Sequence, residues 1–181
     1  MEADHTHEKQ SDLAESNEIG SHDHEPQFHS HKIPDIRSKL CESMSETCRI
    51  KSTISIENEI IDTSLQLAKS QEIGILLSSS NFNEVMQDLS TSKVSTEFIN
   101  LQNQLNQQIL YDYLDINTQG IFCSVRVCGA SFKYKNSDEW ESFQKDFFSK
   151  NEHLGNLFIA HFDNETRVLF FPDDESKGII R

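Results

Sequence analysis

Apolar side chains recur at seven-residue intervals through the first half of the chain. The stripe runs through Leu40, Ile54, Ile61, Ala68, Ile75, Phe82 and Leu89, with the polar Thr47 as its one exception. Such a repeat is typical of a helix that lies against another helix. The positions three residues further on are mostly polar, so a complete knobs-into-holes seam is missing. The stripe predicts association through helices, with candidate interface residues Leu40, Ile54, Ile61, Ile75, Phe82 and Leu89.

Residues 35–118 are therefore expected to form a helical arm, either coiled-coil-like or folded as a helical hairpin. The dipeptide Pro34-Asp35 suits a helix start. A break near 74–81 is possible, because Asn81 and Glu84 have the spacing of a capping box.

A second helix is predicted from about Val94 to Leu114. Its apolar face comprises Val94, Phe98, Leu101, Leu105 and Ile109. This face is out of phase with the stripe, which predicts a further break near 90–93. The uncharged amides between Gln102 and Gln108 fit a helix that either hydrogen-bonds across a helical interface or faces water.

A small domain with its own core is expected over residues 119–172. Nine of the twelve phenylalanines and the single tryptophan lie between Phe122 and Phe171. Alternating apolar residues predict one hairpin over 121–134, with its turn at Gly129-Ala130, and a second over 157–171.

Between the hairpins, Asn136 and Glu139 form a second capping box and predict a short helix. Its buried side is expected to carry Trp140, Phe143 and Phe147. The expected fold class is α+β: a long N-terminal helical arm followed by a small β-hairpin–α–β-hairpin domain, with a frayed tail over 173–181.

Charge and hydropathy exclude several classes of partner. The net charge is −14, so the chain lacks the excess of basic residues needed for a direct grip on nucleic acid or an anionic membrane. The sequence contains no apolar run long enough for a membrane span and no signal peptide of ordinary form. We therefore expect an intracellular protein, cytoplasmic or nuclear, with a protein partner in a homo- or hetero-oligomer.

Residues 1–34 are acidic, poor in apolar side chains and expected to be disordered. They contain three H-x-H pairs, and imidazole is a good ligand for zinc, copper or nickel. The candidate metal ligands are His5, His7, His22, His24, His29 and His31. A metal-buffering or metal-delivery protein is thus the alternative functional hypothesis.

The four cysteines are interpreted as free thiols. On one helix, Cys41 and Cys48 would lie about 10 Å apart along the axis, too far for a disulfide. In one continuous strand, Cys123 and Cys128 would point to opposite faces.

Catalytic motifs are missing from the sequence, and it predicts neither catalytic nor cofactor-binding residues. His153 and His161 have no neighbour in sequence that suggests a general base. The order of acidic tail, helical arm and small C-terminal domain resembles that of assembly subunits such as kinetochore proteins. The leading hypothesis is a non-enzymatic subunit or adaptor that associates through its arm and its Phe-rich domain.

Overall fold

A computed structural model describes residues 34–43, 45–91, 95–151, 154–172 and 178–180. The chain divides after His31, and every described residue belongs to the unit Lys32–Arg181. The predicted tail at 1–34 therefore lies outside the described residues except for Pro34. The mixed α and β class predicted from the sequence is confirmed for the described part.

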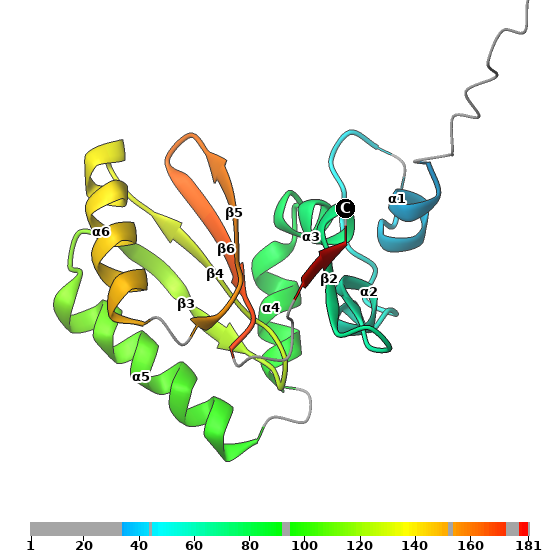
Figure 1. Cartoon of the computed structure of the whole chain (residues 1–181). Coiled ribbons are helices and arrows are strands. Elements are labelled where there is room, and N and C mark those ends of the chain that lie inside the picture. Colours follow the sequence, from blue (N-terminus) through cyan, green and yellow to red (C-terminus); the bar gives the residue numbers. More distant parts are fainter. Residues whose placement is uncertain (1–33, 44, 92–94, 152–153, 173–177, 181) are drawn as a thin grey trace, which may run out of the picture. The chain divides into compact units, whose positions relative to one another are not determined.

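A four-stranded antiparallel sheet is the centre of the unit (Figure 1). Its strands are β3 (Asn117–Cys123), β4 (Cys128–Lys133), β5 (Leu157–Phe162) and β6 (Glu165–Phe170), in the order β3-β4-β6-β5. Helix α6 (Ser137–Lys150) joins the two hairpins. The predicted hairpin–helix–hairpin arrangement is confirmed.

The first turn lies elsewhere than predicted. Residues 124–127 connect β3 to β4, and Gly129 and Ala130 are inside β4. The Ser124 side chain stabilises this turn, because its hydroxyl accepts the backbone N–H of Val127 at 3.2 Å. Close packing against α4 (Phe82–Thr91) requires glycine at position 129, because a Cβ there would lie 2.7 Å from Met86 Cε.

Helix α6 begins as its sequence predicts. The backbone N–H of Glu139 donates to Asn136 Oδ1 at 3.0 Å, so the side chain of Asn136 satisfies one of the helix's first donors. Trp140, Phe143 and Phe147 are buried, which confirms the predicted apolar side.

Residues 34–91 form a series of short helices and strands, so the predicted coiled-coil-like arm or helical hairpin is wrong for this segment. The helices are α1 (Pro34–Leu40), α2 (Ile56–Ile60), α3 (Ser70–Leu77) and α4 (Phe82–Thr91). The predicted break at 74–81 is confirmed between α3 and α4. Helices this short need tertiary packing, because isolated helices below about 12 residues are marginal in water.

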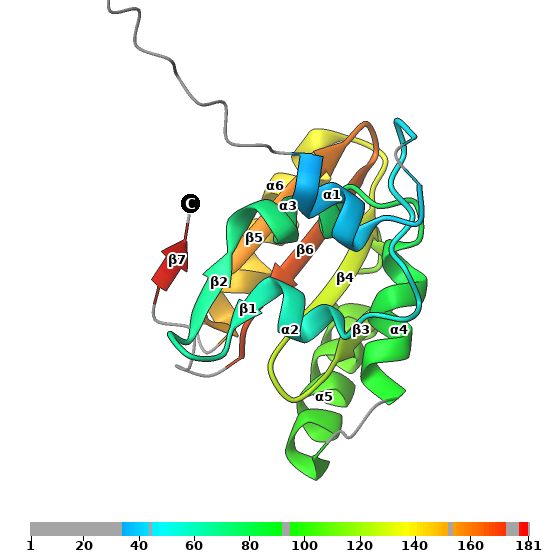
Figure 2. The same ribbon diagram turned by 90° about the vertical axis from the view of Figure 1, so that its right-hand side faces the viewer.

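Two more strands follow α2. They are β1 (Ile61–Asp62) and β2 (Leu67–Lys69), which pair antiparallel. β2 also pairs in parallel with β7 (Gly178–Ile180), visible at one side of Figure 2. These three C-terminal residues are thus in a strand, in contrast to the predicted fraying.

The four-stranded sheet is covered on both faces. One core joins α1–α4 to Val127, Leu169 and Phe171, while the other includes side chains from α5 (Thr96–Asp112), α6 and the opposite sheet face. Figure 1 shows α5 and α6 on one side of the sheet and the earlier helices on the other. Among the described helices, none is long and apolar enough to cross a membrane.

The predicted second helix, 94–114, is confirmed as α5. Its amide side chains bind the backbone of β3, at the edge of the sheet: Asn106 bonds to Ile121, and Gln102 accepts from Cys123 N at 2.8 Å. These amides therefore satisfy backbone groups at a sheet edge, a role distinct from the two that the sequence suggested.

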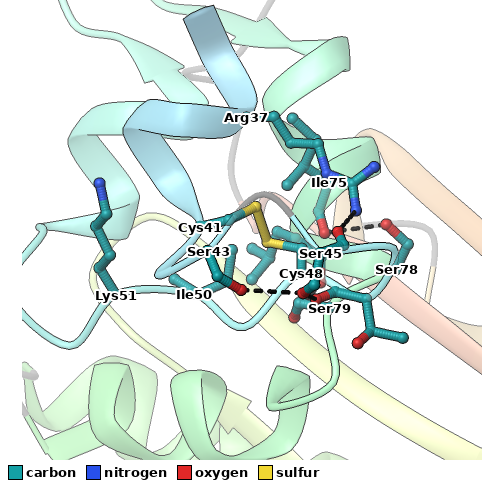
Figure 3. Close-up of a disulfide and its surroundings, with 12 residues drawn as sticks. Arg37, Cys41, Ser43, Ser45, Cys48, Ile50, Lys51, Ile75, Ser78 and Ser79 are labelled. Carbon is teal, nitrogen blue, oxygen red and sulfur yellow. Dashed lines mark hydrogen bonds between the residues drawn. A yellow bond between two sulfur atoms is a disulfide. The ribbon is translucent and has the colours of Figure 1, made fainter. Parts of the chain in front are cut away.

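Both cysteine pairs are disulfides, so the interpretation as free thiols is wrong. α1 ends at Leu40, so Cys41 and Cys48 lie in a loop with their Cα atoms 5.3 Å apart. Figure 3 shows this bond, near the residues of α3 and the loop that follows it. Cys123 and Cys128 are direct partners across the β3–β4 hairpin, with their Cα atoms 4.1 Å apart. The prediction failed because it placed each pair on a single regular element.

Candidate functional site

The apolar stripe belongs to the protein's own core. Leu40, Ile61 and Phe82 are at most 6% exposed, and Ile54, Ile75 and Leu89 pack partly buried against the same core. The first three are therefore covered by their own chain, and the prediction that they form a subunit interface is wrong. The stripe offers no continuous exposed face.

An open groove of about 880 Å³ lies between the C-terminal end of α5 and α6. The segment 112–116 forms one side, and residues on and just before α6 form the other. The lining residues are Asp112, Tyr113, Leu114, Asp115, Ile116, Asn136, Asp138, Glu139, Ser142, Phe143, Lys145, Asp146 and Ser149. We call this the acidic groove.

Five carboxylates line the acidic groove, at Asp112, Asp115, Asp138, Glu139 and Asp146, against one cation, Lys145. Ion pairs engage two of the five. Lys135 Nζ lies 3.8 Å from Asp115 Oδ1, and Lys150 Nζ lies 2.7 Å from Asp146 Oδ2. The carboxylates of Asp112 and Asp138 belong to exposed residues. The groove thus presents a concentrated negative potential.

Tyr113 connects the floor of the groove to the core. Its ring meets Phe143 edge to face, with centroids 5.0 Å apart. Its hydroxyl donates to Asp146 Oδ2 at 2.7 Å. Burial, assisted by the neighbouring Asp146 carboxylate, raises the pKa of Tyr113 above its usual value. The Tyr113 phenol is therefore neutral at physiological pH and positions Asp146.

Asp146 is held ionised by its two donors. The hydrogen bond from Lys150, followed by that from Tyr113, lowers the pKa of Asp146. In turn, the hydrogen bond to Asp146 raises the pKa of Lys150. The carboxylate at this side of the groove is a fixed, charged acceptor over the physiological pH range.

Exposed apolar side chains lie beside these charges. Leu110, Tyr111 and Leu114 are 65%, 73% and 83% exposed. Leu114 lines the groove itself, and the other two occupy the last turns of α5. Large apolar groups at this exposure, next to a charged cavity, are typical of a protein interaction surface.

Of the histidines considered as site residues, the structure describes His161 alone. His161 Nδ1 lies 2.9 Å from Thr166 Oγ1, but Thr166 is fully buried and out of reach of a substrate. His153 and the six candidate metal ligands, His5, His7, His22, His24, His29 and His31, lie outside the described residues. Within the described part of the chain, no cluster of three or more histidine, cysteine or acidic side chains is arranged to hold a metal ion.

The acidic groove was not foreseeable from sequence spacing. Its carboxylates are scattered between positions 112 and 146, and only the packing of α5 against the sheet and α6 brings them to one cavity. One local signal was available: Leu110, Tyr111 and Leu114 lie on or beyond the polar side of a predicted amphipathic helix.

Comparison with other proteins does not assign the site. No protein-family model matches the chain, and no curated protein or solved structure matches it.

Proposed function

We propose that the protein is a non-enzymatic interaction subunit or adaptor whose acidic groove binds a basic segment of a protein partner. The observation that carries this proposal is the combination of five carboxylates with the exposed Leu114 in one open groove. Lysine or arginine side chains of the partner would pair with the carboxylates. An apolar side chain would pack on Leu114, Tyr111 and Leu110.

In this proposal the acidic groove, and not the apolar stripe, is the surface that contacts the partner. The fully buried stripe residues have no area left for a partner, whereas the groove residues Asp112, Leu114 and Asp115 are exposed. Electrostatic attraction of this kind mainly sets specificity and the association rate, and it weakens as salt screens the charges.

A charge-reversal variant tests the groove. Asp112→Lys/Asp115→Lys places two cations at one side of the cavity. The control Glu46→Lys/Asp88→Lys changes the net charge equally at exposed positions outside the groove. Affinity purification and mass spectrometry from the native organism should recover partners with wild type and control and lose them with the groove variant. Equal recovery by both variants would contradict the proposal.

The location of the protein is a separate proposal. The sequence favoured the cytoplasm or nucleus, but two disulfides favour an oxidising compartment, because cytosolic thiols are kept reduced. Alkylation of protein isolated from its own cells, under denaturing and non-reducing conditions, distinguishes an oxidising compartment from the cytoplasm or nucleus. Four unmodified cysteines support the oxidising compartment, and alkylated thiols support the cytoplasm or nucleus.

A further inference from the structure

The two edge strands of the four-stranded sheet differ in what their outward backbone groups bind. At β3, the amide side chains of Asn106 and Gln102 bind the backbone groups of the edge strand. At β5, no other strand of the described chain pairs with the outer side (Figure 2). One edge is closed by side chains, and the other leaves a row of backbone groups without a strand partner.

The register of the second hairpin shows which groups these are. Phe171 N donates to Asn156 O, so this pair is hydrogen-bonded. Because hydrogen-bonded pairs alternate in an antiparallel ladder, Phe158, Ala160 and Phe162 also bond to β6. The N–H and C=O groups of Leu157, Ile159 and His161 therefore point away from the sheet.

The sequence of β5 lacks the charged residues and proline that protect many edge strands. Its sequence, LFIAHF, contains no lysine, glutamate, aspartate, arginine or proline. Natural sheets generally place such residues on exposed edges to prevent pairing with another chain. The absence of these residues from β5 leaves the edge competent to add a strand.

A hollow of about 480 Å³ lies at the His161 end of this edge. Tyr134, Trp140 and His161 supply rings, and Glu141 and Asp163 supply carboxylates, while no lysine or arginine lines it. Trp140 is 4% exposed, whereas Glu141 and Asp163 are exposed, so an occupant of the hollow meets both carboxylates. Carboxylates beside aromatic rings favour a cationic side chain.

We infer that the free edge of β5 binds an extended segment of a protein partner, which adds a fifth strand and places a lysine or arginine in the hollow beside Trp140. The backbone groups of Leu157, Ile159 and His161 provide affinity, and the hollow provides selectivity for a cation. This site is separate from the acidic groove and does not rest on it.

Charge complementarity selects this occupant over a second copy of the chain. Two copies would each bring a net charge of −14, and pairing of two six-residue strands buries less than the roughly 1,200 Å² of a stable interface. A basic extended segment meets Glu141 and Asp163 with attraction, and strand addition needs only its backbone and alternate side chains.

The test uses the full chain and synthetic eight-residue peptides of alternating threonine and valine with one central lysine. In amide NMR spectra, the lysine peptide should shift the signals of Leu157, Ile159, His161 and the Trp140 indole. Replacing its lysine by glutamate should weaken binding about tenfold. Methylating alternate peptide nitrogens should abolish binding, because it removes donors without changing side chains.

Variants assign the effect to the hollow. Glu141→Lys/Asp163→Lys should lose the preference for lysine over glutamate, while Asp112→Lys/Asp115→Lys in the acidic groove should bind the lysine peptide like wild type. Three results would overturn the inference: equal affinity for the lysine and glutamate peptides, undiminished binding of the methylated peptide, or a doubling of mass through β5 in sedimentation without peptide.

Discussion

Asn106 and Ile121 form a reciprocal pair across the α5–β3 junction. Ile121 N donates to Asn106 Oδ1 at 2.7 Å, and Asn106 Nδ2 donates to Ile121 O at 3.0 Å. One amide side chain thus substitutes for the neighbouring strand that β3 lacks. The pair fixes the helix that carries one side of the acidic groove.

Replacing Asn106 by leucine should therefore be costly. The change leaves the N–H and C=O of Ile121 without partners, and each part-buried group costs about 1–3 kcal/mol. We expect urea denaturation to show a loss of about 2–4 kcal/mol in the free energy of unfolding. The control Asn103→Leu, exposed on the same helix, should change stability by less than about 0.5 kcal/mol. Similar effects at both positions would contradict this role for Asn106.

Gly155→Ala should destabilise the second hairpin. Gly155 has a φ of 67°, and a Cβ there would lie 2.2 Å from the carbonyl oxygen of Phe171. Strain and backbone displacement together should cost about 2–4 kcal/mol in thermal or urea unfolding.

The matched control is Gly74→Ala in helix α3. A Cβ at Gly74 meets nothing within 4 Å, so alanine should stabilise the protein by about 0.4–1 kcal/mol. The two substitutions are chemically the same and should act in opposite directions, and a loss of stability at both would show that the assigned backbone conformations are wrong.

The contribution of Asp146 should depend on pH. Its folded-state pKa is lowered, so its stabilising effect is present above the unfolded pKa of about 4 and lost as pH falls through the folded value. Asp146→Asn should therefore be less stable than wild type at pH 7. The difference should shrink as the pH is lowered from about 5 towards 2. A difference that stays constant over this range would exclude a charged Asp146 as its source.

Both disulfides should resist reduction in the folded protein. The four cysteines are at most 3% exposed, so a reductant reaches them only after local or global opening. We expect mass spectrometry after treatment with dithiothreitol and iodoacetamide to show no labelling without denaturant and four labels in urea. Rapid labelling of Cys41 and Cys48 alone would show that their loop opens independently.

The sequence predicted the C-terminal half well because its signals are local. The capping box at Asn136 and the spacing of Trp140, Phe143 and Phe147 depend only on nearby residues, and the structure confirms them. The seven-residue stripe led to a wrong prediction of a helical arm because its residues belong to different elements. Leu40 ends a helix, while Ile61 and Ala68 lie on short strands. These positions share a core, and their even spacing does not reflect one helix.

The position of the turn between β3 and β4 decides whether Cys123 and Cys128 can form a disulfide. With the turn placed at Gly129, Cys123 and Cys128 fall on one strand and opposite faces. The actual turn at 124–127 makes them cross-strand partners. The acidic groove and the free edge of β5 were beyond prediction, because each depends on which distant elements pack together.

The pairing of β2 with β7 constrains how the protein matures during synthesis. β2 leaves the ribosome early, but its parallel partner Gly178–Ile180 emerges only after all four strands of the main sheet. While those four strands are being synthesised, β2 therefore has an open side of its own. An unpaired strand side can pair with another chain, so this is a stage at which a chaperone would protect the nascent protein.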